Sequence, residues 1–176
     1  MHAEALNWLK GQVRADATLL GRHGIDIGGR NVNGSIQTIF RPASWMALDH
    51  EEGRGVDIVA DLRGYQPFRT WGLVACTEVA EHLEKDDLVL LIQTLWRCCS
   101  HDGVVLFTAA TDPRKPHSAV GSPVVPAGEP YNNVNVEELS HLAHCYFQQA
   151  KVEVDRKHGD VYMRASRPRA TPLKVN

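Results

Sequence analysis

Apolar side chains follow two spacings along this chain, one typical of helices and one typical of strands. Across 3–20 they recur every three or four positions, which predicts an amphipathic helix. Short apolar runs of strand length follow at 23–28, 45–50, 56–61 and 73–76. The run at 73–76 contains no polar position, as expected for a parallel strand that is buried on both faces.

The second half of the chain continues this alternation of helical and strand-like segments. Asp86 and Asp87 can cap a helix that runs to about Ser100 with one apolar stripe. Asn135 with Glu138 three residues later resembles a capping box, which predicts a further helix. Three more β-prone runs lie at 104–108, 150–154 and 160–165.

This order of elements predicts an α/β fold. Strands that alternate with helices indicate a mostly parallel sheet, and a hairpin at the C-terminal end would add an antiparallel edge. A chain of 176 residues with 43% apolar content is the right size for one domain, so we expect a single domain over 1–176.

One long segment interrupts the alternation. Five of the nine prolines lie at 112–130, together with two glycines and two serines. A loop of this length inside a compact domain is either functional or disordered. It follows a strand at the edge where open α/β sheets bind ligands. We interpret it as a lid over an acceptor pocket, and a mobile surface loop is the alternative.

Composition narrows the possible partners and compartment. The formal net charge is −2, so no general positive field attracts nucleic acid. No apolar run approaches the ~20 residues of a membrane span, and no signal-peptide core is present. The cysteines lack C-x-x-C spacing and predict reduced thiols in a cytoplasmic protein. The four are Cys76, Cys98, Cys99 and Cys145.

The nine histidines do not form an obvious metal-binding pattern. His141, His144 and Cys145 share a predicted helix, but a structural zinc site needs a fourth ligand. We therefore assign no metal ligands from the sequence.

The most informative motif is a glycine-rich turn at 24–35. An apolar run reaches Asp26 and continues into Gly28 and Gly29, where close approach of ligand and backbone calls for glycine. Asp49 ends the next apolar run, about 20 residues further on, where a carboxylate meets ribose hydroxyls in Rossmann-like sheets. The strict G-x-G-x-x-G pattern is absent, which makes a nicotinamide cofactor the weaker interpretation.

Three segments together resemble the class I S-adenosylmethionine-dependent methyltransferases. They are DIGGRNVNGS, ALDHEEGRGVDIVADL and CTEVAEHL, and the resemblance is close over roughly 20–112. It implies a Rossmann-like fold, with a mostly parallel seven-stranded sheet, one antiparallel edge strand and helices on both faces. It also implies S-adenosylmethionine as the cofactor.

The resemblance also implies roles for particular residues. Gly28 and Gly29 would pack against the methionine part of the cofactor, and Asp49 would hold its ribose. The remaining roles concern the adenine, the sulfonium and the pocket as a whole. Asp61 with Leu62 would meet the adenine, and Thr77 and Glu78 would lie beside the sulfonium. His82 would lie near the acceptor. The residues that would complete the cofactor site are Asp26, Arg30 and His50.

Two residues of the third segment are candidates for catalysis. A hydroxyl or protonated amine acceptor needs a base, and His82 is the first candidate because histidine titrates near neutral pH. Glu78 can hold the cofactor's amino group or the acceptor. The alternatives are that His82 only packs or caps its helix, and that Glu78 is a solvated carboxylate in a turn. His117 and Tyr131 flank the proline-rich loop and can face substrate or be ordinary loop residues.

The predicted function is methyl transfer to a hydroxyl or amine of a small-molecule, sugar-like or peptide acceptor. DNA amino-methyltransferases carry an N-P-P-Y-like string after the fourth strand, and methylation of cytosine C5 uses a Pro-Cys nucleophile. This chain has neither motif, which disfavours nucleic acid as the acceptor. A non-catalytic protein that binds S-adenosylmethionine or S-adenosylhomocysteine is one alternative. A nucleotide-sugar or nicotinamide enzyme is the other, and the oligomeric state stays open.

Overall fold

The computed structural model describes residues 3–32 and 34–175, so Asn33 of the glycine-rich turn lies outside the described residues. Its centre is one seven-stranded sheet in the order β3-β2-β1-β4-β5-β7-β6. The strands are β1 (His23–Ile27), β2 (Ser44–Asp49), β3 (Ile58–Val59), β4 (Trp71–Thr77), β5 (Cys99–Ala110), β6 (Phe147–Asp155) and β7 (Asp160–Pro168). Neighbours from β3 to β5 pair in parallel, whereas β7 pairs antiparallel with both β5 and β6.

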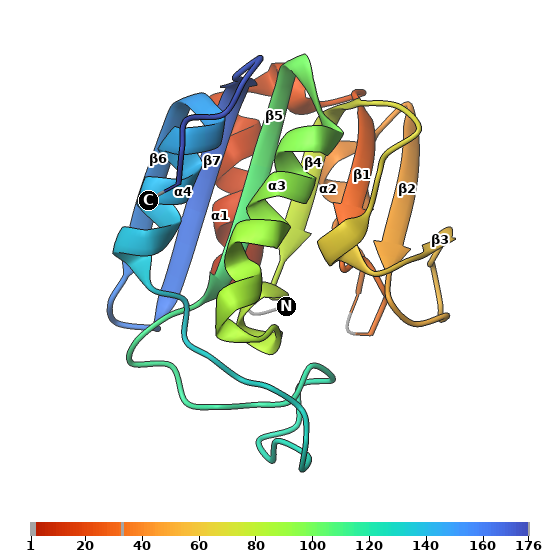
Figure 1. The fold of residues 1–176 in the computed structure, drawn as a ribbon. Coiled ribbons are helices and arrows are strands. Elements are labelled where there is room, and N and C mark those ends of the chain that lie inside the picture. The colour runs from red at the N-terminus through yellow and green to blue at the C-terminus, as the bar shows by residue number, and fades with distance from the viewer. Residues whose placement is uncertain (1–2, 33, 176) are drawn as a thin grey trace.

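Helices cover both faces of this sheet. They are α1 (Ala3–Ala15), α2 (Gln37–Phe40), α3 (Leu88–Cys98) and α4 (Val136–Tyr146). In Figure 1, α3 and α4 lie in front of the sheet, and α1 and α2 lie behind it. This architecture confirms the predicted fold class, including the antiparallel edge formed by the C-terminal hairpin. Among the described residues no helix is both long and apolar enough to cross a membrane.

The side chains of β4 show how the two layers are held together. Successive strand residues point to opposite faces of a sheet. Leu73 and Ala75 accordingly join the apolar cluster with Leu9 and Phe40 from α1 and α2. Val74 and Cys76 join the other cluster, which contains Leu91, Leu95, Leu139 and Leu142 from α3 and α4. β4 is thus buried on both faces, as its unbroken apolar run predicts.

Several element boundaries differ from those predicted by periodicity. The first helix ends at Ala15 because the Asp16 carboxylate accepts a hydrogen bond from the Thr18 backbone N–H at 3.0 Å, which starts a separate 3-10 turn. The third strand is reduced to β3, two residues long. β5 is longer than predicted at both ends, because Cys99 already pairs with Trp71 of β4 and the antiparallel partner β7 extends the pairing to Ala110.

The two predicted helix caps have different outcomes. Asn135 is the cap of α4, since its Oδ1 accepts from the backbone N–H groups of Glu137 and Glu138. Asp87 occupies the N-cap position of α3 as predicted, but its side chain makes no capping hydrogen bond there. Its carboxylate instead accepts a hydrogen bond from the Arg63 guanidinium at 3.2 Å.

The long segment after β5 begins against the turn that joins β6 to β7. In Figure 1 the segment lies below the sheet, at the end where the parallel strands terminate. Arg114 anchors its start, since the guanidinium donates to the His158 carbonyl and pairs with Asp160. Gly159 has a φ of +72° there, and a Cβ on it would lie 2.5 Å from the Arg114 backbone nitrogen.

This contact makes Gly159→Ala a test of the packing between the turn and the loop. Gly21 is a matched control, with a φ of +73° and open space where a Cβ would be. Gly21→Ala should cost about 1–2 kcal/mol from backbone strain alone. Gly159→Ala should cost roughly 1–3 kcal/mol more because it also overlaps backbone atoms. The free energies of unfolding in urea measure both, and equal values would contradict the packing argument.

Candidate functional site

A pocket opens at the carboxyl ends of β1, β2 and β4. This is the place where the strand order reverses, and open α/β sheets bind ligands in that crevice. Ten of the eleven predicted site residues line it. They are Asp26, Gly28, Gly29, Arg30, Asp49, His50, Leu62, Thr77, Glu78 and His82.

The glycine-rich turn is pinned between two strands. The backbone N–H groups of Gly28 and Gly29 both donate to the Leu48 carbonyl, at 2.7 and 3.0 Å. Gly28 has a φ of +75°, and a Cβ on it would overlap the Val79 side chain. A Cβ on Gly29 would lie 2.8 Å from Cβ of Ala47. Glycine is therefore required here by packing within the protein as well as by backbone conformation.

Asp26 is a buried carboxylate with an unsatisfied oxygen. It is only 6% exposed, and its Oδ1 has no hydrogen-bond partner. Burial, and then the charge of the nearby Asp49, raise the pKa of Asp26 to about 7. A group of this kind is suited to receive a cation or a hydrogen-bond donor from a ligand.

Asp49 connects the glycine-rich turn to the loop after β2. Its Oδ2 accepts from the Arg30 backbone N–H at 3.2 Å, and its Oδ1 accepts from the Glu51 backbone N–H at 3.1 Å. His50 Nδ1 lies 3.1 Å from the same Oδ1. The Arg30 side chain pairs with Glu51 and closes this rim of the pocket. Asp49 is buried and faces the pocket, as its spacing from the glycine turn predicts.

Asp61 is the one predicted site residue that does not line the pocket. Its side chain is 53% exposed and is held by the Arg63 guanidinium, with Arg63 Nη2 2.6 Å from Asp61 Oδ2. The hydrogen bonds from Arg63 lower the pKa of Asp61. Its neighbour Leu62 is buried and does line the pocket, so the segment after β3 contributes an apolar side chain there.

The segment after β4 forms the opposite wall. Glu78 has a φ of +57°, a conformation that non-glycine residues rarely adopt. Its backbone N–H donates to the Thr108 carbonyl at 2.8 Å, and its Oε1 accepts from the Thr108 hydroxyl at 2.8 Å. These two bonds to β5 hold the strained residue in place and direct the chain into η3 (Ala80–His82).

His82 is the residue of η3 that lines the pocket. Its side chain is 10% exposed, and the ring packs against the rings of His117 and Tyr131, with centroids 5.3 and 5.7 Å away. Burial, followed by the neighbouring His117, lowers the pKa of His82 to about 4. The imidazole is therefore uncharged at neutral pH, and its low proton affinity makes it a weak base. The predicted base role stays a prediction.

The pocket also has lining residues that the sequence analysis did not assign. Val79 and Leu83 belong to the CTEVAEHL segment and could have been found there. Val32, Gly34 and Ile36 follow the first strand, and Ala119 comes from the proline-rich loop. No local signal marks Ala119, because only the folded path of the loop brings it to the pocket.

No family model matches the sequence, and no curated protein matches it. Solved structures do match its fold. DesVI of Streptomyces venezuelae has a TM-score of 0.67 and 9% identity, covering 93% of this chain and 91% of its own. The N-methyltransferase NodS from Bradyrhizobium japonicum WM9, solved with S-adenosylhomocysteine, has a TM-score of 0.65 and 12% identity, covering 94% and 87%.

A third similar structure is 1,6-didemethyltoxoflavin-N1-methyltransferase from Burkholderia thailandensis, solved with 1,6-didemethyltoxoflavin and S-adenosylhomocysteine. Its TM-score is 0.65 at 11% identity, and the match covers 93% of this chain and 78% of that one. These similarities show that the chain has the Rossmann-like fold of the methyltransferases.

The burial of Asp26 predicts a pH-dependent effect on stability. In the unfolded chain this group ionises near pH 4, but in the folded protein only near pH 7. Its ionisation therefore lowers the free energy of unfolding as the pH rises through this range. Asp26→Asn should be more stable than wild type at pH 8 by roughly 2–4 kcal/mol, with little difference below pH 4. Urea unfolding at several pH values tests this, with the exposed Glu52→Gln as control. A difference that does not change with pH would contradict it.

Proposed function

We propose that this chain is an S-adenosylmethionine-dependent methyltransferase that transfers a methyl group to a hydroxyl or amine of a small-molecule, sugar-like or peptide acceptor. The observation that carries the proposal is the pocket itself. A glycine turn and two buried carboxylates, Asp26 and Asp49, converge where the strand order reverses. Proteins of the same fold, NodS among them, were solved with S-adenosylhomocysteine.

The residues of the pocket fit this cofactor. Asp26 has an unsatisfied carboxylate oxygen, and the cofactor's methionine end carries an ammonium group that can satisfy it. We assign the path beside Gly28 and Gly29 to that end of the molecule. Because Asp26 is buried, such a charged hydrogen bond would be stronger than it would be in water.

The ribose and adenine belong to the other wall of the pocket. Asp49 would accept hydrogen bonds from the ribose hydroxyls, with Arg30 and His50 at the rim beside it. Leu62 offers an apolar surface to the adenine ring. The predicted contact of Asp61 with the adenine amine remains a proposal, and it requires the carboxylate to turn away from Arg63.

When bound, S-adenosylmethionine supplies an activated methyl group on a sulfonium. The protein's task is to hold the acceptor in line with the carbon–sulfur bond, and such positioning can contribute about 7–11 kcal/mol. Thr77 and Glu78 are assigned to this part of the pocket, and His82 to the acceptor side. The Thr108 hydroxyl donates a hydrogen bond to Glu78 and so fixes the direction of this carboxylate. A catalytic proton transfer to His82 or Glu78 remains a proposal.

A small-molecule acceptor is the part of the proposal that similar structures support. One of them was solved with 1,6-didemethyltoxoflavin bound. The net charge of −2 does not favour a nucleic acid acceptor. We also infer a cytoplasmic location, since all four cysteines are buried free thiols.

Calorimetry of the purified protein tests the cofactor assignment. S-Adenosylmethionine and S-adenosylhomocysteine should bind with a stoichiometry of one, and NAD should not bind. Asp49→Ala should weaken S-adenosylhomocysteine binding by about tenfold or more, since a charged hydrogen bond contributes ~1.5–3 kcal/mol. Glu52→Gln is the control, because it removes an exposed charge of the same loop.

Three results would overturn parts of this assignment. Unchanged affinity in a folded Asp49→Ala variant would remove Asp49 from the ribose site. Binding of NAD alone would favour a nicotinamide enzyme. Cofactor binding without methyl transfer to any fraction of a cell extract would favour a non-catalytic binding protein.

The proline-rich loop should act on the acceptor rather than on the cofactor. The pocket is lined mainly by the ends of β1, β2 and β4 and by the segments that follow them, and the loop contributes only Ala119. Replacing 118–128 with a short Gly-Ser linker should therefore leave cofactor affinity within about twofold and lower turnover at least about tenfold. Full turnover in this variant would contradict a lid, and lost cofactor binding would place the loop in the cofactor site.

A further inference from the structure

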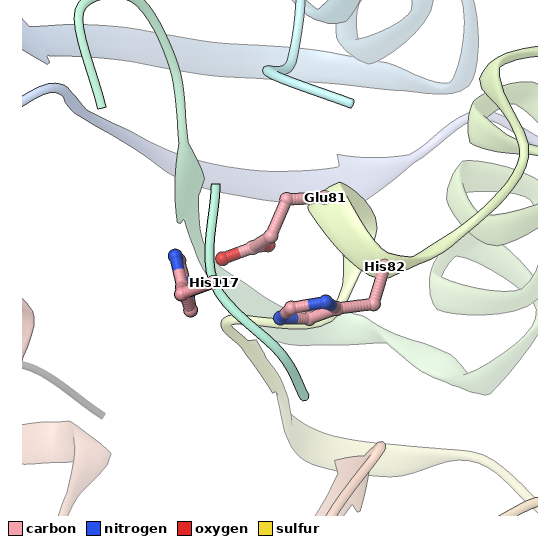
Figure 2. Close-up of side chains that lie close together, drawn as sticks. All are labelled: Glu81, His82 and His117. Carbon is pink, nitrogen blue, oxygen red and sulfur yellow. The ribbon is translucent and has the colours of Figure 1, made fainter. Parts of the chain in front are cut away.

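We propose that Glu81, His82 and His117 bind one divalent transition-metal ion, with Zn²⁺ as the preferred metal. Two of these residues belong to η3, directly after β4, and the third belongs to the loop after β5. One possible ligand atom from each residue lies within 4.8 Å of the others. Figure 2 shows the Glu81 carboxylate directed into the space between the two imidazole rings.

The first argument for an ion is the state of Glu81. This side chain is fully buried, and neither carboxylate oxygen has a hydrogen-bond partner of good geometry. Burial and the charge of Glu78 raise its pKa to about 8, although the backbone N–H groups of Glu81 itself and of Ala110 act to lower it. Arg114, a cation that acts electrostatically on Glu81, is already bonded to the His158 carbonyl and Asp160. An isolated carboxylate is costly to bury without a partner. A bound cation would compensate this cost.

The second argument is the condition of the His82 ring. The ring is only 10% exposed, and its buried Nδ1 has no hydrogen-bond partner. Glu129 Oε1 lies 3.6 Å from His82 Nδ1. Metal-bound histidines commonly have such a carboxylate beside the ring, where it fixes the tautomer and the orientation. The backbone N–H of Ala119 donates to Glu129 and holds this carboxylate within the loop.

The donor set indicates which metals fit. Mg²⁺ and Ca²⁺ prefer oxygen ligands, whereas two imidazoles with one carboxylate form the His₂Glu set of catalytic zinc sites. Such a set leaves at least one coordination position open. Fe²⁺ can use a similar triad, so it is a competitor for the same position.

The ion would join two parts of the chain that are far apart in sequence. His117 would be tied to η3, which fastens the loop at 112–130 beside the pocket that His82 lines. If the proposed function holds, the open coordination position can polarise an acceptor hydroxyl. That consequence rests on the proposed function, whereas metal binding itself does not.

The chain offers an internal control for this site. On α4, Cys145 Sγ lies 3.7 Å from His141 Nε2, and this pair of side chains could also attract zinc. His144 does not complete that pair, since its Nδ1 lies 2.7 Å from the Ser140 carbonyl oxygen. Over 3–32 and 34–175, the Glu81 group is the one cluster of three or more ligands close enough to share an ion.

The test begins with protein dialysed against a chelator and then into metal-free buffer. Zn²⁺ is titrated by calorimetry without cofactor, and Co²⁺ is followed by its visible absorption. Wild type should bind one equivalent of Zn²⁺ with a Kd on the order of 1 μM or tighter. Glu81→Gln and His117→Ala should each weaken binding roughly tenfold or more. His141→Ala should bind as wild type does, and Mg²⁺ should not compete.

A second measurement addresses the loop. Zn²⁺ should slow hydrogen exchange at 112–130 in wild type but not in His117→Ala. S-Adenosylhomocysteine affinity should be unchanged in His117→Ala, so failure of the metal site is distinguishable from failure of the cofactor site. Equal Zn²⁺ affinity in wild type and His117→Ala, or loss of binding in His141→Ala, would overturn the proposal. His117 lies in a loop, so we expect His117→Ala to fold. Its Zn²⁺ affinity can therefore be compared with that of wild type even if Glu81→Gln does not fold.

Discussion

The central position of β4 is the constraint on which the rest of the structure depends. β4 pairs in parallel with β1 and β5, and both of its faces are buried under helices. Because all three strands run the same way, the glycine-rich turn after β1 and η3 after β4 emerge side by side at one edge. Val79 then packs onto Gly28, and this contact leaves no room for a larger residue in the turn. The wall of the pocket is thus a direct result of how the core is layered.

Unfavourable groups are concentrated at this same edge. Asp26 and Glu81 are buried acids whose pKa values are raised above the usual range by loss of water and by neighbouring carboxylates. Glu78 is held in a left-handed conformation by two bonds to Thr108. Backbone strain and unsatisfied buried polar groups of this kind persist only where the surrounding structure enforces them, and they gather at functional sites. We interpret the two acids as belonging to two adjoining sites, one for an organic cofactor and one for a metal ion.

The loop after β5 links these two sites. It contributes Ala119 to the pocket, His117 to the metal cluster and Glu129 to the surroundings of His82. Its start is fixed by Arg114 against the β6–β7 turn, so the antiparallel edge of the sheet also positions the loop. If the proposed metal ion binds, it would control how firmly this segment is held, and the lid stays a prediction.

The sequence by itself determined the fold class, the order of the strands along the chain and most of the pocket's lining. The fold class and the strand order follow from local signals, because strand periodicity, the glycine turn and the spacing of Asp49 are all read over short stretches of chain. Most of the other lining residues were implied by the resemblance to the class I methyltransferases. Only the tertiary structure decided that Asp61 turns away to Arg63 while Leu62 faces the pocket. It also decided that Glu81 is buried beside His117, 36 positions further along. No local sequence signal predicts the contact between Glu81 and His117. It depends on the path of a long loop that packs against η3, and sequence spacing carries no information about such a path.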